Sequence, residues 1–309
     1  MIPAAPITAT NRDGVSIIIP HLNQHEALER CLASLDAQEG VDCPVQVIVV
    51  DNGSRVSLDA LAARRRDVEF LVETQPGPGM ARNTGVAAAR HARLMFIDAD
   101  CRAHHHWIVR GLVGLAGAPI CGGDVQIDVA NAPELTAIEA YESVFAYRQT
   151  LYIRRDGFSG TGNLATTRGI YERIGPFAGI GVAEDRDWGQ RARTMGIITQ
   201  YRADMIVYHP ARESIEELKQ KWRRHVAHDL AKHRSDGKSN ARWLLLAGAV
   251  AASIIPHAFM TLRSPRLSGT RNRYAAISVL ARIRVFRVAE MVRNLRAGAT
   301  DHSAAWNRS

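Results

Sequence analysis

The chain has 309 residues, with 39 Lys and Arg against 31 Asp and Glu, and a formal net charge of +8. With 46% hydrophobic and 23% charged residues it can bury a core, which excludes disorder throughout and the collagen-like and fibrous classes. The positive charge lies in the last third, since residues 211–309 hold 19 basic and 7 acidic side chains whereas residues 1–210 hold 20 and 24. We therefore expect a mildly acidic domain over 1–210 and a basic, partly apolar helical region over 211–309.

Short apolar runs alternate with helical patterns in the first hundred residues. The expected strands cover 15–19, 45–50, 68–72 and 94–97, and the expected helices cover 26–38, 58–66 and 79–90. This alternation predicts βαβ units and a mostly parallel central sheet. Ligands bind such sheets beyond the carboxyl ends of the strands, where Pro20, Asp51 and Asp98 stand. The glycine fingerprints of dinucleotide-binding and P-loop proteins are absent from the sequence.

The rest of the chain is less regular up to residue 210 and helical beyond it. We expect a helix over 134–152, a glycine-rich loop over 157–163, a helix over 184–195 and a strand over 205–208. Beyond residue 211 we expect a basic helix over 214–233, an uncharged stretch over 243–262 and a basic-apolar segment over 274–296.

Polar side chains with catalytic chemistry follow several of these elements. Asp98 and Asp100 are able to converge on a hard cation such as Mg²⁺ or Mn²⁺, although a solvated turn is the ordinary interpretation of an isolated pair. Asp51 is able to accept hydrogen bonds from a nucleobase or ribose, or to cap a turn. Arg82 opens a helix whose N-terminus favours anions, and it either adds charge near a diphosphate or is solvated.

Other candidates lie in the middle of the chain. Glu184 and Asp185 begin a helix, so one of them is placed as a general base for a hydroxyl, with helix-dipole stabilisation as the alternative. His209 follows a strand and is either a further ligand of the cation or structural. Asn163 and Arg168 flank the Gly-Thr-Gly loop and either bind sugar hydroxyls or hold a turn.

Two other groups of residues are of types that bind metal ions, but we assign them no function. His104, His105 and His106 are consecutive, and since consecutive side chains do not converge easily we expect an exposed loop. The cysteines lack the CxxC spacing and no signal-peptide pattern precedes them, so we expect free thiols in the cytoplasm.

Five motifs gain specificity from their order and spacing over about residues 14–210. They are Val15-Ser-Ile-Ile-Ile-Pro-His-Leu-Asn23, Val49-Val-Asp-Asn-Gly-Ser54, Gly79-Met-Ala-Arg-Asn-Thr-Gly85, Phe96-Ile-Asp-Ala-Asp100 and Ala183-Glu-Asp185. Together they resemble the family 2 inverting glycosyltransferases of GT-A fold. The resemblance implies an α/β nucleotide-sugar-binding fold with a mostly parallel central sheet, here followed by a C-terminal helical extension. It also implies metal-dependent transfer of a sugar from a nucleotide sugar, usually a UDP-sugar, to a hydroxyl.

The resemblance further implies a role for individual residues. Asp185 matches the catalytic base of the family, and Asp98, Asp100 and His209 match ligands of Mn²⁺ or Mg²⁺. The nucleotide-sugar pocket is assigned to Pro20, Asn23, Asp51, Arg82, Asn83 and Asp98, and the sugar or acceptor pocket to Gly162, Asn163 and Glu184. The Gln-x-x-Arg-Trp signature of processive members is missing, so chain extension of the synthase type is not expected.

The C-terminal region indicates where such an enzyme acts. At about 1.5 Å per residue the stretch 243–262 is long enough to cross a hydrocarbon core of roughly 30 Å, with a packed helical hairpin as an equal alternative. Apolar residues interleaved with arginines over 274–296 suit a helix on anionic lipid. We expect a cytoplasmic protein bound peripherally at the inner membrane, with a glycan or lipid-linked oligosaccharide as acceptor in polysaccharide biosynthesis.

Three alternatives remain at this point. A sugar-nucleotide nucleotidyltransferase also uses a metal and carboxylates, but typically has a glycine-rich basic loop after the first strand, unlike His21-Leu-Asn-Gln24. A non-catalytic nucleotide-sugar binder is disfavoured by the complete set of carboxylates. A nucleic-acid-binding protein would use the basic tail, but no helix-turn-helix, zinc or RNA-binding signature is found there, so no nucleic-acid partner is expected.

Overall fold

The computed structural model describes residues 14–129 and 133–296, which cluster into two compact units. The first unit comprises residues 1–126 and 147–209, and the second comprises residues 127–146 and 210–309. The absence of a signal-peptide pattern concerns residues that lie largely before residue 14 and so outside the described part.

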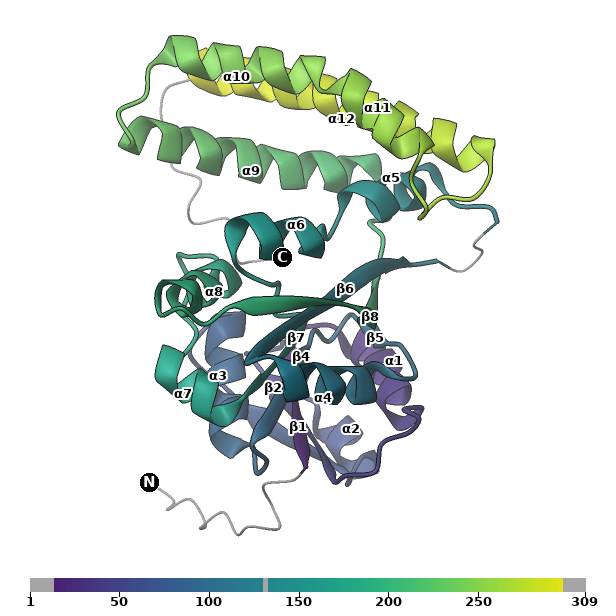
Figure 1. The fold of residues 1–309 in the computed structure, drawn as a ribbon, viewed down its shortest axis with the longest axis vertical. Coiled ribbons are helices and arrows are strands. Elements are labelled where there is room, and N and C mark those ends of the chain that lie inside the picture. Colours follow the sequence, from purple (N-terminus) through teal and green to yellow (C-terminus); the bar gives the residue numbers. More distant parts are fainter. Residues whose placement is uncertain (1–13, 130–132, 297–309) are drawn as a thin grey trace. The chain divides into compact units, whose positions relative to one another are not determined.

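An eight-stranded sheet runs through the first unit (Figure 1). The strands are β1 (Val15–His21), β2 (Val45–Asp51), β3 (Val68–Val72), β4 (Arg93–Ile97), β5 (Arg102–Ala103), β6 (Ile120–Asp128), β7 (Asn163–Thr167) and β8 (Thr199–Pro210). Their order across the sheet is β3-β2-β1-β4-β7-β6-β8-β5. The predicted strands β1 to β4 are parallel, whereas β7 runs antiparallel to β4 and β6, and β5 antiparallel to β8.

Helices cover both faces of this sheet. The helices of the first unit are α1 (His25–Asp36), α2 (Asp59–Arg64), α3 (Pro78–Ala88), α4 (Trp107–Gly117), α6 (Gln149–Leu151), the π-helix Tyr152–Asp156, α7 (Arg168–Ile174) and α8 (Glu184–Thr194). Ile17 and Ile19 belong to the core that contains α1 and α4, and Ile18 to the core that contains α3, α7 and α8. Burial on both faces explains why β1 is apolar throughout rather than alternating.

The strand register brings the predicted site residues to one edge of the sheet. His21 at the end of β1 is paired with Asp51 at the end of β2. Ile97, the residue before Asp98, is paired with Asn163 of β7. Because parallel strands end at a common edge, the polar residues that follow them gather there.

The second unit is helical. Its helices are α5 (Ala137–Phe145), α9 (Ile215–Ser235), α10 (Asn240–Ala252), α11 (Ile254–Leu262) and α12 (Thr270–Arg296). The long α12 packs against each of the other four, which is why residues 127–146 belong to this unit although the sequence analysis placed them in the first domain (Figure 1). The uncharged stretch is divided at Ser253 into α10 and α11.

The helix predicted over 134–152 is wrong in its extent. It begins with a capping box of Thr136 and Glu139, but α5 ends at Phe145. Tyr147 then has a φ of 44°, in the left-handed region that non-glycine residues rarely adopt, so the helix cannot continue. Hydrophobic spacing did not reveal this interruption.

Candidate active site

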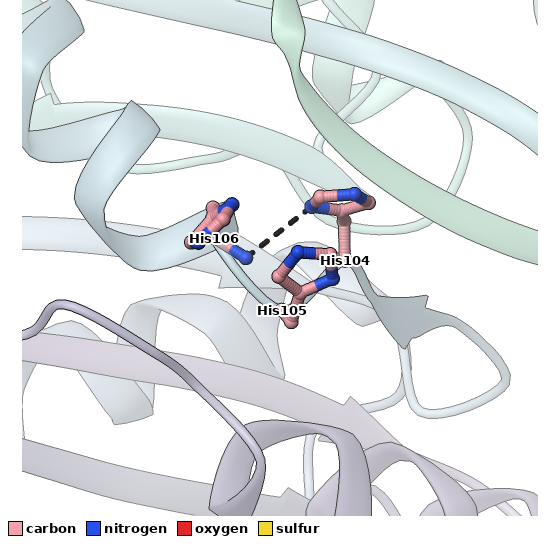
Figure 2. Close-up of side chains that lie close together, drawn as sticks. All are labelled: His104, His105 and His106. Atoms are coloured by element: carbon pink, nitrogen blue, oxygen red, sulfur yellow. Dashed lines mark hydrogen bonds between the residues drawn. The ribbon is translucent and has the colours of Figure 1, made fainter.

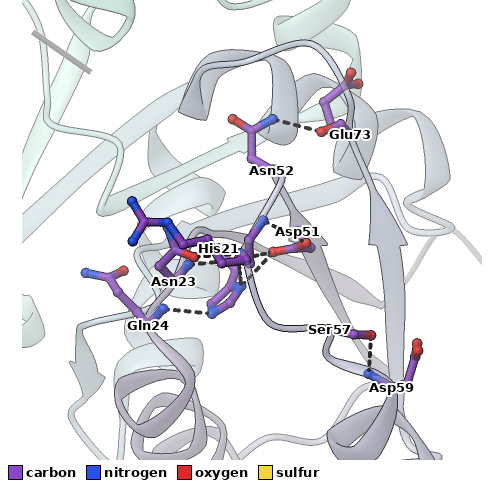
Figure 3. Close-up of polar contacts among 10 residues, drawn as sticks. His21, Asn23, Gln24, Asp51, Asn52, Ser57, Asp59 and Glu73 are labelled. Atoms are coloured by element: carbon purple, nitrogen blue, oxygen red, sulfur yellow. Dashed lines mark hydrogen bonds and ion pairs between the residues drawn. The ribbon is translucent and has the colours of Figure 1, made fainter. Parts of the chain in front are cut away.

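A hydrogen-bonded group lies at the carboxyl ends of β1 and β2 (Figure 3). His21 Nδ1 is 2.9 Å from Asp51 Oδ1, and the backbone N–H of Ser54 donates to Asp51 Oδ2 over 3.2 Å. Burial lowers the pKa of His21 despite its carboxylate partner, which favours the neutral ring. Burial acts to raise the pKa of Asp51, but the hydrogen bonds from Ser54 and His21 outweigh it and that pKa is lowered. Asp51 is thus an ionised carboxylate at the ligand-binding edge of the sheet.

Asn23 and Gln24 extend this group toward the aspartates that follow β4. Asn23, with a φ of 57°, donates its backbone N–H to Ser54 Oγ over 2.8 Å. Gln24 donates its backbone N–H to His21 Nε2 (3.1 Å) and its side-chain Nε2–H to Asp100 Oδ2 (3.3 Å). Gln24 therefore connects the end of β1 with Asp100.

Arg82 is 3% exposed and lies between two carboxylates. Its Nη2 donates to Asp98 Oδ1 over 2.7 Å, and its Nη1 donates to Glu184 Oε1 over 2.8 Å. Desolvation raises the pKa of Asp98; the charge of Arg82 opposes this rise and the charge of Asp100 adds to it. The arginine thus joins α3, the end of β4 and the start of α8, and it partly neutralises a concentration of negative charge.

His209 lies beside Asp100. Its Nε2 is 3.3 Å from Asp100 Oδ2 and 2.9 Å from Tyr147 Oη. Burial acts to raise the pKa of Asp100, but the hydrogen bond and charge of His209 outweigh this and the pKa is lowered. The pairing of β5 with β8 makes the contact, because it aligns Arg102 with Tyr208 and so places His209 near the end of β4.

Asp185 lies in the first turn of α8, next to Glu184. Burial raises the pKa of Asp185 from 3.8 to about 6, and the charge of Glu184 adds to the rise. Its Oδ1 accepts a hydrogen bond from the backbone N–H of Arg186 over 2.6 Å. A carboxylate with a pKa near 6 is ionised at neutral pH and still basic enough to accept a proton in catalysis.

Gly162 is placed against the aspartate pair. A Cβ atom at this position would lie 2.5 Å from Asp98 Oδ2, closer than non-bonded atoms approach. Glycine is therefore required if Asp98 is to keep its side-chain position.

Residues 16–171 match the family profile of glycosyl transferase family 2. The chain is also 33% identical over 217 residues to the glycosyltransferase AglE of Haloferax volcanii, covering 68% of this chain and 71% of AglE. The chain belongs to glycosyltransferase family 2. It is similar as well to the succinoglycan biosynthesis protein ExoO of Rhizobium meliloti, with 35% identity over 43% of each protein.

Among solved structures, this family 2 glycosyltransferase is similar to the mannosyltransferase PcManGT from Pyrobaculum calidifontis, determined with GDP-Man and Mn²⁺. The TM-score is 0.54 with 19% identity, over 93% of this chain and 88% of that one. The similarity confirms the predicted GT-A fold, and family membership selects a glycosyltransferase from the classes that the sequence left open.

Three other predicted site residues of the glycosyltransferase are engaged in holding the fold. Asn83 accepts at Oδ1 from the hydroxyl of Tyr171 (2.7 Å) and from the backbone N–H of Phe177 (2.9 Å). Asn163 is fully buried; it accepts from Trp107 Nε1 and donates to two backbone carbonyls. Pro20 is buried within β1. Contact of these residues with substrate stays a prediction.

Arg168 contributes to the fold as well. Its guanidinium donates to the backbone carbonyl of Ala89, which joins α7 to the end of α3. This contact agrees with the structural alternative for Arg168.

The three consecutive histidines lie in a loop, as expected, with His105 exposed and His104 and His106 half-buried, but their rings lie closer together than we expected (Figure 2). Each of His104, His105 and His106 offers a ligand atom, and these atoms all lie within 4.8 Å of one another. The loop turns sharply into α4, whose first residue is Trp107, and this turn brings the rings together.

The sequence analysis gave no role to three side chains that contact predicted site residues. They are His21, which holds Asp51, Gln24, which reaches Asp100, and Tyr147, which contacts His209. His21 and Gln24 lie within five residues of the end of a predicted strand, which was the available signal. Tyr147 had none, because its contact depends on a backbone turn inside a predicted helix.

Proposed function

We propose that the chain transfers a sugar from a nucleotide sugar, most simply a UDP-sugar, to a hydroxyl of a glycan or lipid-linked oligosaccharide, inverting the anomeric carbon. The observation that carries this proposal is a chain of contacts at the sheet edge: Arg82 binds Asp98 and Glu184, His209 lies beside Asp100, and Asp185 is close enough to feel the charges of Arg82 and Asp98. Two relatives support it: ExoO is named for succinoglycan biosynthesis, and PcManGT was determined with a nucleotide sugar.

The residues present fit a divalent cation. Two carboxylates and an imidazole suit Mn²⁺ or Mg²⁺, which leave further positions to phosphate oxygens and water. The 3.3 Å between Asp100 Oδ2 and His209 Nε2 is a separation that two ligands of one ion adopt. When bound, the cation supplies Lewis-acid neutralisation of the charge on the nucleoside diphosphate. Mn²⁺ in PcManGT supports this assignment, and the choice between the two metals is part of the test.

The chain's own residues supply the remaining chemistry. Asp51 accepts hydrogen bonds from the base or ribose, and Arg82 provides positive charge at the start of α3, where a helix N-terminus favours the diphosphate. Asp185 takes the proton of the acceptor hydroxyl as that oxygen bonds to the anomeric carbon. The bond from this carbon to the diphosphate breaks in the same displacement, and the anomeric configuration inverts.

A donor screen tests the proposal. UDP-, GDP- and TDP-sugars are added with Mn²⁺ or Mg²⁺, and one of them is expected to raise Tm. A ligand present at a concentration of 100 times its Kd raises the free energy of unfolding by about 2.7 kcal/mol. Asp100→Asn is expected to lose the metal-dependent part of the shift, whereas the exposed-site control Asp36→Asn retains it. The proposal fails if no nucleotide sugar shifts Tm, or if Asp100→Asn behaves like the control.

We also propose that the second unit binds an anionic membrane surface. In the part of the chain that the structure describes, one stretch is long and apolar enough to span a bilayer: Asn240–Leu262, whose most apolar 18 residues have a mean hydropathy of 1.8 and are 11% buried. Leu245 is 76% exposed and Phe259 56% exposed. Arg242 and Arg263 flank the apolar residues, and such an arrangement suits contact with anionic lipid.

Vesicle sedimentation checks the membrane proposal. The wild type is expected to sediment with phosphatidylglycerol vesicles more than with phosphatidylcholine vesicles, and less at high salt. Leu245→Asp combined with Phe259→Asp is expected to reduce the bound fraction several-fold. Val113→Asp, on the exposed face of α4, is the matched control and should bind as the wild type does. Equal sedimentation of all three proteins would contradict the proposal.

A further inference from the structure

A second group of metal-ligating side chains lies between β5 and α4, apart from the aspartate pair. The ring centroids of His104 and His105 are 3.9 Å apart, and those of His105 and His106 are 4.1 Å apart (Figure 2). Imidazole nitrogens favour Zn²⁺ and similar transition metals over the hard cations that carboxylates prefer. The group therefore differs in chemistry from the site formed by Asp98 and Asp100.

The backbone of this loop is held in place by the segment that follows α1. Gln38 donates its side-chain N–H to the carbonyl of His104 (2.9 Å), and its Oε1 accepts from the N–H of Ile108 (2.9 Å). Glu39 donates its backbone N–H to the carbonyl of His105 over 2.7 Å. Hydrogen bonds to residues about 65 positions earlier thus hold the backbone of the histidines in place. This lowers the entropic cost of binding a metal ion.

Glu39 places a carboxylate beside His106, next to the group of three histidines whose ligand atoms lie within 4.8 Å of one another. Its Oε2 lies 3.4 Å from Nε2 of His106. Two ligands of a tetrahedral ion, with bonds of about 2.0–2.1 Å, lie about 3.4 Å from each other. The side chains of His106 and Glu39 are 37% and 66% exposed, so an ion reaches them from solvent without rearrangement of the core.

Nearby positive charges are already paired. Arg102 stacks on the ring of Tyr208 at 4.3 Å, and Arg110 Nε lies 3.8 Å from Asp204 Oδ2. The backbone N–H of His106 donates to His104 Nδ1 over 3.2 Å, and coordination through that nitrogen exchanges this one long hydrogen bond for a metal bond. The carboxylate of Glu39 offsets part of the charge of a divalent ion.

We propose that His104, His105, His106 and Glu39 form a second metal site, selective for Zn²⁺ over Mg²⁺ and Mn²⁺, that ties the segment after α1 to the loop before α4. This loop begins four residues after Asp100, so the ion stabilises the segment that follows the donor-binding aspartates. Its role is structural, and it is independent of the sugar-transfer proposal.

Calorimetric titration of the full chain with ZnCl₂ tests the second site. Asp100→Asn serves as the background, so that Zn²⁺ bound beside His209 does not contribute. One equivalent is expected to bind with micromolar or lower Kd in excess Mg²⁺, and to raise Tm. His105→Gln and His106→Gln are expected to weaken binding at least tenfold, and Glu39→Gln several-fold. His228 is an exposed histidine on α9, and His228→Gln is the matched control that should bind Zn²⁺ as the background does.

Two results would overturn the inference. Binding that is unchanged in His105→Gln and His106→Gln would place the ion elsewhere. Binding that responds to the histidines but not to Glu39→Gln would indicate weak capture by a run of histidines rather than a built four-ligand site. Circular dichroism of each metal-free variant shows whether it is folded before the titration is interpreted.

Discussion

Asp185→Asn is expected to lower kcat by about 10²–10⁴-fold, because the amide cannot take the proton of the acceptor hydroxyl. Donor binding should persist, since the nucleotide-binding residues lie on other segments. The measurement is sugar transfer under saturating donor, with the metal-dependent rise in Tm by donor as the control for binding. Transfer close to the wild-type rate would rule out Asp185 as the base.

The pH dependence gives a second check on the same residue. With its pKa raised to about 6, Asp185 is expected to impose a tenfold loss of kcat/KM for each pH unit below about 6. Glu184→Gln removes the neighbouring negative charge, so the acid limb should move to lower pH. If the acid limb of the pH profile is unchanged in Glu184→Gln and is still present in Asp185→Asn, it reports the titration of another group.

The same shift in pKa has a consequence for stability. The folded-state pKa of Asp185 lies above its unfolded value, so the folded chain binds the proton more tightly and loses stability as the pH rises from about 4 to 6. At neutral pH Asp185→Asn is therefore expected to have a higher Tm than the wild type, together with its lower expected kcat.

Arg82→Met is expected to destabilise the first unit by about 1–3 kcal/mol, because it leaves Asp98 and Glu184, whose side chains are 37% and 20% exposed, without their buried cation. It should also abolish the rise in Tm caused by donor. Urea unfolding measures the first effect and the donor titration the second. The double variant Arg82→Met with Glu184→Gln removes one uncompensated carboxylate, so it should recover part of the stability but none of the donor binding.

The matched control for Arg82 is an exposed ion pair. Arg64 contacts Glu29 across side chains that are 65% and 52% exposed. Arg64→Met is expected to change stability by less than about 1 kcal/mol. If Arg82→Met costs no more than Arg64→Met, the charge network around Arg82 is not what holds α3, β4 and α8 together.

The sequence predicted the parallel half of the sheet well because β1 to β4 are continuous β-branched or apolar runs that end in polar turns. It missed β6, which contains Gly122 and Gly123 and so has a weak strand signal. The structure explains Gly123, since a Cβ atom there would lie 2.2 Å from the carbonyl oxygen of Met205. A close approach between distant segments leaves no periodic pattern in the sequence.

The candidate site, like the sheet, could be predicted from the sequence only in part. Asp98, Asp100 and Asp185 follow or begin regular elements, so their positions at the ligand edge could be inferred from the chain order. The bridge that Arg82 makes between Asp98 and Glu184 could not be inferred, because Glu184 reaches the site only through the packing of α8. The proximity of the three histidines was not foreseen for a related reason: Gln38 and Glu39, far away in the sequence, hold the backbone of that loop by hydrogen bonds.

The contact between Gly162 and Asp98 bears on any attempt to redirect this enzyme to new sugars. Loop 157–163 is an attractive target for randomised libraries, because it ends beside the aspartate pair. At position 162, however, even alanine brings a methyl group within 2.5 Å of Asp98 Oδ2, so library members altered there must displace this carboxylate and are expected to be less active regardless of the acceptor offered. Diversity is better introduced at positions of the loop that do not contact Asp98.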